Sequence, residues 1–188
     1  MAPILGIWAS AQSAAAITSY ESIATFTSSG STNLIQFTSI PSTYTHLQLR
    51  IFARSAQAAS TDTIYFRFNG DSTNNYSRHL LSGDGASATG TGYYPENVIF
   101  AGTIAAASST ASAFGAYVVD ILDYTNTNKN KVTRSLGGYD ANGSGVIDFR
   151  SANWGSTTAI TSITLANYTA GANFANGSHF ALYGIKGA

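Results

Sequence analysis

One segment of the chain carries oxygen-bearing side chains at the spacing of a calcium-binding loop. Asp140-Ala-Asn-Gly-Ser-Gly-Val-Ile-Asp148 places Asp140, Asn142 and Ser144 at the alternate ligand positions of an EF-hand loop, with Gly145 at its sharp turn. The twelfth position, which should be a bidentate Glu, is Ser151, and the flanking residues have strand patterns rather than helical ones. The segment therefore favours the turn of a β-hairpin between strands at 131–139 and 146–150, and we expect no metal.

The histidines do not form a recognisable catalytic or metal-binding pattern. His46, His79 and His179 lack metal-ligand spacing, and no Gly-x-Ser-x-Gly nucleophile elbow occurs. Structural or surface roles are the favoured interpretation for all three.

Carboxylates are few, with nine Asp and Glu residues in the whole chain. Asp120 and Asp123 would point to opposite faces of a strand because their spacing is odd. Glu21, Glu96 and Asp148 are far apart in sequence, so only the fold decides whether they meet as a glycosidase-type pair. We expect no enzyme activity and no cofactor.

Aromatic residues offer a second kind of chemistry, since exposed Tyr and Trp can stack on a sugar. The best candidates for exposure are Tyr93 and Tyr94, beside Pro95, and Trp154 in the segment Asn153-Trp154-Gly155. Contact between subunits explains them equally well, because Tyr and Trp are enriched at protein interfaces.

The charge balance excludes some classes of partner. Only 10% of residues are charged, and nine basic residues balance nine acidic ones. Nucleic acid and anionic membrane surfaces are bound by a basic excess, so neither partner is expected. A neutral surface with few charges has little self-repulsion and associates readily.

The first residues, Met1-Ala-Pro-Ile-Leu-Gly-Ile-Trp8, are apolar and uncharged. They lack the positive region of a signal peptide, and the apolar run is too short to span a membrane. We expect an N-terminal arm at 1–17, followed by a single domain at 18–188. Ile4, Leu5, Ile7 and Trp8 are the arm side chains expected to insert into a groove on a neighbouring protein. The chain has no cysteine, so stability must come from packing and association.

Period-two alternation recurs along the chain, which predicts an all-β protein. In 46–54 the inward face is Leu47, Leu49, Ile51 and Ala53, and in 63–68 it is Ile64, Phe66 and Phe68, before the turn signal Asn69-Gly70. Further strands are expected at 22–27, 33–37, 97–103, 114–124, 131–139, 146–150, 161–165 and 179–185. In the last of these, Phe180 and Leu182 should face the core, and Gly184 should allow close approach of another backbone. Roughly ten short strands without crossover helices indicate an antiparallel β-sandwich, with a jelly roll as the first choice. The segments least like strands are 10–16, 74–81, 86–92 and 105–113.

Several stretches carry a family resemblance. They are Thr18-Ser-Tyr-Glu-Ser-Ile-Ala24, Ser39-Ile-Pro-Ser-Thr-Tyr-Thr-His-Leu-Gln48, Phe68-Asn-Gly-Asp71 with Asn75-Tyr76, Ile121-Leu-Asp-Tyr-Thr-Asn126, Ser135-Leu-Gly-Gly-Tyr139 and Phe180-Ala-Leu-Tyr-Gly-Ile-Lys186. Together, in this order, they resemble a loosely related group of virion proteins of tailed bacteriophages, especially those of cyanobacteria and other aquatic hosts.

The resemblance implies a structural protein on the outside of a virion and supplies no catalytic residues. The favoured role is a capsid decoration (cement) protein that binds the major capsid protein and stabilises the shell after assembly in the bacterial cytoplasm. A homotrimer is expected, because trimeric jelly rolls suit local threefold positions. The alternative is a tail or head-fibre module that binds host carbohydrate, with an enzyme such as a depolymerase third.

Overall fold

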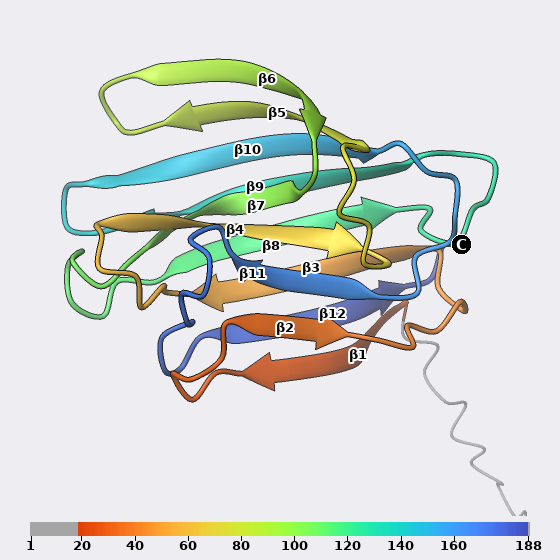
Figure 1. Cartoon of the computed structure of the whole chain (residues 1–188), viewed down its shortest axis with the longest axis horizontal. Coiled ribbons are helices and arrows are strands. Elements are labelled where there is room, and N and C mark those ends of the chain that lie inside the picture. The colour runs from red at the N-terminus through yellow and green to blue at the C-terminus, as the bar shows by residue number, and fades with distance from the viewer. Residues whose placement is uncertain (1–18, 188) are drawn as a thin grey trace, which may run out of the picture.

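The computed structural model describes residues 19–187, and in this range the chain forms twelve β-strands. They are β1 (Tyr20–Thr27), β2 (Leu34–Phe37), β3 (His46–Ala53), β4 (Thr61–Phe68), β5 (Tyr76–Gly83), β6 (Ala88–Glu96), β7 (Ile99–Ala105), β8 (Gly115–Leu122), β9 (Lys131–Asp140), β10 (Gly145–Trp154), β11 (Ile163–Asn167) and β12 (His179–Ile185). The predicted all-β class is confirmed, and Figure 1 shows the strands stacked as two layers.

The strands form two antiparallel sheets in the order β1-β12-β3-β8-β9-β10-β5-β6 and β2-β11-β4-β7. The quartets β1-β12-β3-β8 and β2-β11-β4-β7 have the strand order of a jelly roll. Successive strands of this plan alternate between the sheets, except that β4 and β7 pair with each other in the smaller sheet. Two hairpins, β5-β6 and β9-β10, are inserted into this plan, and both extend the larger sheet. The expected sandwich and its jelly-roll topology are therefore confirmed.

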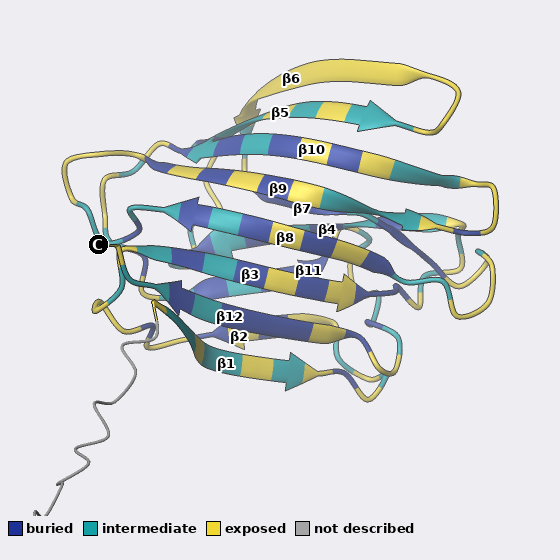
Figure 2. Ribbon diagram, turned by 180° about the vertical axis from the view of Figure 1, so that it is seen from behind, coloured by how far each residue is buried: buried dark blue, intermediate teal, exposed yellow. Residues whose placement is uncertain are grey.

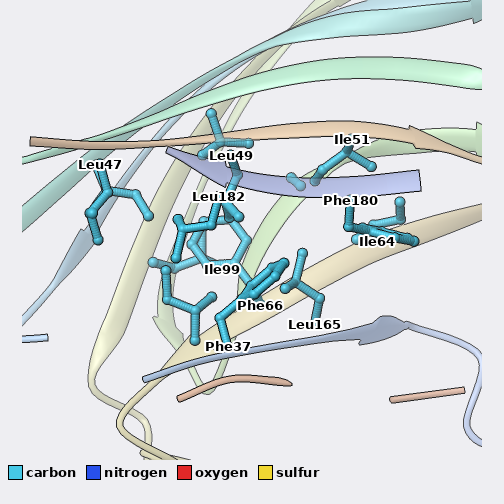
Figure 3. Close-up of a cluster of buried hydrophobic side chains, with 14 of the residues drawn as sticks. Phe37, Leu47, Leu49, Ile51, Ile64, Phe66, Ile99, Leu165, Phe180 and Leu182 are labelled. Carbon is cyan, nitrogen blue, oxygen red and sulfur yellow. The ribbon is translucent and has the colours of Figure 1, made fainter. Parts of the chain in front are cut away.

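The core lies between the inner faces of the two sheets (Figure 3). The alternation in β3 and β4 puts the predicted side chains there: Leu47, Leu49, Ile51, Ala53, Ile64, Phe66 and Phe68 are all buried. Each fully buried large apolar side chain stabilises the fold by about 1.5–3 kcal/mol before ordering costs. The chain leaves β4 through Asn69 and Gly70, whose φ angles are 51° and 70°, as the turn signal predicted.

Two segments that were expected to be loops are strands. Residues 74–81 and 86–92 contribute most of β5 and β6, which pair from Tyr76 with Glu96 to Gly83 with Ala88. Sequence pattern missed β6 because the strand is exposed along almost its whole length. A strand without a buried face shows no apolar alternation, since backbone pairing alone places it.

A buried ion pair lies between the sheets. Arg150 donates to Asp148 at 2.7 Å, and the same carboxylate accepts the backbone N–H of Thr103 on β7 at 3.0 Å. Burial opposes ionisation of Asp148, but the Arg150 guanidinium outweighs it and lowers the pKa. Because β7 and β10 belong to different sheets, this pair fixes how the two layers meet.

The C-terminal strand β12 is an inner strand of the larger sheet, pairing with the edge strand β1 on one side and with β3 on the other. Phe180 and Leu182 are fully buried, as predicted. The expectation for Gly184 is corrected, because what approaches it is the ring of Tyr44 rather than another backbone. A Cβ at position 184 would lie 2.3 Å from that ring.

Leu182→Ala should lower the free energy of unfolding by about 2–5 kcal/mol, since it opens a cavity in the centre of the core. Leu81→Ala is the matched control, because Leu81 is more than half exposed on the outer face. Urea denaturation of both variants measures the difference. Equal, small losses in the two variants would show that β12 is peripheral to the core.

Candidate functional site

The calcium-like segment forms the predicted hairpin turn between β9 and β10. Asn142 and Gly143 have positive φ angles of 59° and 98°, and Asp140 Oδ1 accepts the backbone N–H of Asn142 at 2.8 Å. The Asp140 carboxylate is thus used to close the turn. Among residues 19–187 no group of three or more His, Asp or Glu side chains is placed to hold a metal ion.

The fold does not bring the three distant carboxylates together. Glu21 on β1 bonds Lys186 at 2.9 Å, Glu96 on β6 pairs with Arg78 at 3.0 Å, and Asp148 is enclosed between the sheets. They do not form the pair that glycoside hydrolysis uses.

The histidines are equally dispersed. His46 on β3 accepts the backbone N–H of Asp123 at 2.9 Å, and His179 on β12 bonds Thr27 at 3.0 Å. His79 lies on β5, against Gly92 of β6. Each has a local structural contact, as its sequence context indicated.

Trp154 was predicted to be exposed, and that prediction is wrong. It is the last residue of β10 and is 3% exposed, with its ring beside Phe68 and Tyr76 at centroid distances of 5.6 and 6.3 Å. Its Nε1–H donates to Asp71 at 2.7 Å. Because the β10 register turns Trp154 toward the core, it cannot bind a sugar or a partner.

Tyr93 and Tyr94 do lie at the surface, on β6, at the outer edge of the larger sheet. Arg78 lies over the Tyr93 ring at 3.8 Å, which holds that ring in place. Tyr94 is 81% exposed. The segment from Ala88 to Tyr94 contains no charged residue, so this edge lacks the charges that commonly block pairing with another strand.

The larger feature is an apolar band across the outer face of the eight-stranded sheet, the face turned to the viewer in Figure 2. Cross-strand pairing aligns two rows on this face. One row is Val118, Leu136, Phe149 and Leu81, and the other is Phe52, Ala116, Gly138, Ile147 and Gly83. Residues directly opposite each other point to the same side, so these side chains are neighbours. We call them the apolar face.

The large side chains of the apolar face are exposed, with Ile147 at 69% and Leu136 at 57%. A third row, Gln48, Asp120, Arg134, Ser151 and His79, is polar and bounds the band on one side. Monomers rarely leave such contiguous apolar surface in water, which makes this face the candidate interaction site of the described residues.

A cavity of about 750 Å³ opens into the apolar face at the β9-β10 turn. Its floor contains Ala116 and Gly138, which face each other across β8 and β9 and have no bulk to fill the space. Phe114, Leu136 and Ile147 also line it. The Phe114 ring stacks on Phe52 at 4.8 Å, which gives one wall a fixed shape. The cavity falls within the range of roughly 300–1,000 Å³ that is typical of binding pockets.

The apolar face could not be recognised from sequence, because it depends on the register of five strands.

The residues that the sequence predicted to insert into a neighbouring protein, Ile4, Leu5, Ile7 and Trp8, lie outside the described residues. No helix long and apolar enough to cross a membrane occurs in the part of the chain that the structure describes.

Comparison with protein-family models, with curated proteins and with solved structures finds no match for this chain.

Asp71→Asn should destabilise the protein by about 1–3 kcal/mol at neutral pH, the usual range for loss of hydrogen bonds to a charged group. Burial opposes ionisation of Asp71, but hydrogen bonds from Thr73, Trp154 and Asn75 prevail and lower its pKa from 3.8 to about 2. A pKa that is lower in the folded state contributes stability above pH 4, and this is lost as pH falls toward 2. Urea denaturation at neutral pH and near pH 2 should show that the difference in free energy of unfolding between the variant and the wild type is smaller in acid. A difference that does not change with pH would contradict the role of the ionised carboxylate.

Proposed function

We propose that this chain is a non-enzymatic structural subunit of a tailed-bacteriophage virion, a decoration (cement) protein on the outer surface of the head. The observation that carries the proposal is the apolar face, which lies open on the larger sheet of residues 19–187. A subunit that functions within an assembly can keep such an apolar surface, because partner proteins cover it.

The chemistry of the surface supports a protein partner. The apolar face is lined by aliphatic and aromatic side chains rather than by Lys and Arg, and the net charge of the chain is zero. Phosphate-bearing partners select basic surfaces, whereas interfaces between proteins have apolar cores with few charges. The major capsid protein and other copies of this chain are the partners proposed.

The resemblance of six stretches of sequence to phage virion proteins supplies the setting. A cysteine-free sandwich is suited to assembly in the reducing cytoplasm of a bacterium. On an icosahedral shell, the local threefold positions favour a homotrimer, in which cyclic symmetry closes the set of contacts.

A receptor-binding module of a tail or head fibre is the second candidate. It is favoured by the β5-β6 hairpin, which carries Tyr94 almost fully exposed and Tyr93 held under Arg78. Aromatic rings at an exposed edge can stack on a sugar.

Quantifying the protein in purified virions separates the two candidates. A decoration protein should be present in a fixed ratio to the major capsid protein, in far more copies than any tail or fibre component. A copy number equal to that of tail proteins would contradict the decoration role and favour the fibre.

Phe149→Asp tests the apolar face in the same particles. Phe149 is about half exposed at the centre of the band, so the variant should fold with a near-native melting temperature and be lost from virions. Leu34→Asp, which alters an equally exposed apolar residue of the smaller sheet, should still be incorporated. Full incorporation of Phe149→Asp would show that assembly does not use this face.

A further inference from the structure

We propose that the cavity of the apolar face binds the segment from Ile4 to Trp8 of a neighbouring copy, and that this exchange of arms links the copies into a closed ring. This inference rests on the proposed function only in one respect: both assign a binding partner to the apolar face. It concerns the purified protein and can be tested without the virion.

The cavity is built for an apolar segment of chain. Its floor is Ala116 and Gly138, and a Cβ at Gly138 would lie 2.1 Å from the carbonyl oxygen of Val146, so the sequence keeps this position empty. Leu136 and Ile147 stand beside the floor with more than half of their surfaces exposed. Large aliphatic or aromatic side chains entering this space would be buried on several sides.

The two carboxylates at the rim do not require a cationic ligand. Asp84 Oδ1 accepts backbone N–H groups of Ala86 and Ser87 at 2.9 and 2.7 Å, and Asp140 Oδ1 accepts that of Asn142. Both groups are engaged in closing their own turns. Apart from the neutral hydroxyl-bearing residues Ser144 and Tyr139, the remainder of the lining is apolar or glycine, so a charged ligand would lose its hydration without a charged partner.

The segment before β1 has the matching chemistry. Residues 1–20 contain no Asp, Glu, Lys or Arg, and Ile4, Leu5, Ile7 and Trp8 are concentrated within five positions. Burying four such side chains stabilises a contact by roughly 1.5–3 kcal/mol each before ordering costs are subtracted.

The position at which this segment joins the sheet allows it to reach beyond its own subunit. Ser19 lies beside Lys186, whose backbone N–H it accepts at 2.9 Å, at the end of β12 that pairs with His46 of β3. The cavity lies at the opposite end of β3 and centres on β9, which is four strands away from β1. From Ser19 it is therefore about 20 Å away along the strands and about 19 Å away across them. The eleven residue-to-residue steps from Trp8 to Ser19 span at most about 36–40 Å. The direct path to its own cavity is about 28 Å and crosses the polar row. The segment is therefore long enough to reach its own cavity or that of a neighbouring copy, and the dilution experiment below distinguishes the two.

An arm from one copy in the cavity of the next is a heterologous contact, in which two different surfaces meet. Such contacts close into rings when the rotation between copies permits it, whereas a face paired with itself gives a twofold dimer. The proposal therefore accounts for the expected trimer with one kind of contact.

Tryptophan fluorescence of the purified full chain tests the proposal. The chain has two tryptophans, and Trp154 is buried in the core, so subtracting the spectrum of Trp8→Phe from that of the wild type isolates Trp8. In the oligomer we expect Trp8 to emit at short wavelength and to resist quenching by iodide. Ile147→Asp, at a highly exposed position that the fold can accommodate, should make Trp8 several-fold more quenchable and yield monomers by light scattering. Leu34→Asp on the other sheet is the matched control and should retain both properties.

Three results would overturn the proposal. Trp8 could be as quenchable as a free peptide in the wild-type oligomer, or Ile147→Asp and Leu136→Asp could both leave its protection unchanged. Protection that persists after dilution to monomers would place the segment in its own subunit and exclude exchange. If Trp8 is protected from iodide in the purified oligomer but the protein is absent from purified virions, the result would count against the decoration role and leave the exchange of arms standing.

Discussion

The burial of two apolar sheet faces against each other is the interaction on which the rest of this structure depends. β3, β4, β8 and β12 place fully buried Leu, Ile, Val and Phe side chains between the layers, and the ion pair of Asp148 with Arg150 fixes the layers through Thr103. The two sheets are unequal, with eight strands against four. The β5-β6 hairpin therefore extends beyond the smaller sheet, as Figure 1 shows, and its edge is available to other molecules.

The parts of the fold that were predictable from sequence are those with one buried face. Alternation in β3 and β4 identifies the strands and their inward side chains because a period of two matches the pleat. The Asn142-Gly143 pair and Gly145 identify the β9-β10 turn, since residues there adopt positive φ. Phe180 and Leu182 likewise reveal that β12 belongs to the core.

The parts that were not predictable depend on contacts between distant segments. β6 shows no apolar alternation, because almost all of it is exposed. Trp154 lies in an Asn-Trp-Gly sequence typical of loops, yet its pairing with Tyr76 and Lys131 turns it inward. Lys131 is itself fully buried, with Nζ donating to the carbonyls of Asn126, Lys129 and Thr157, an arrangement that no local pattern indicates.

The apolar face is the clearest case of this limit, and it is also the basis of the proposed function. Leu136 and Phe149 are ordinary strand residues in sequence, and only the register of β9 against β10 makes them neighbours on the outer side. The inner side of this sheet contributes to the core, and the outer side leaves apolar side chains exposed. The proposed role as an assembly subunit depends on that outer side.

Cryo-electron microscopy of the intact particle would show directly where this chain lies. If it is a decoration protein, jelly-roll density should appear on the outer surface of the head at repeated lattice positions, with the apolar face covered by protein. Density for this chain confined to the tail or a fibre, with the apolar face open to solvent, would contradict that role.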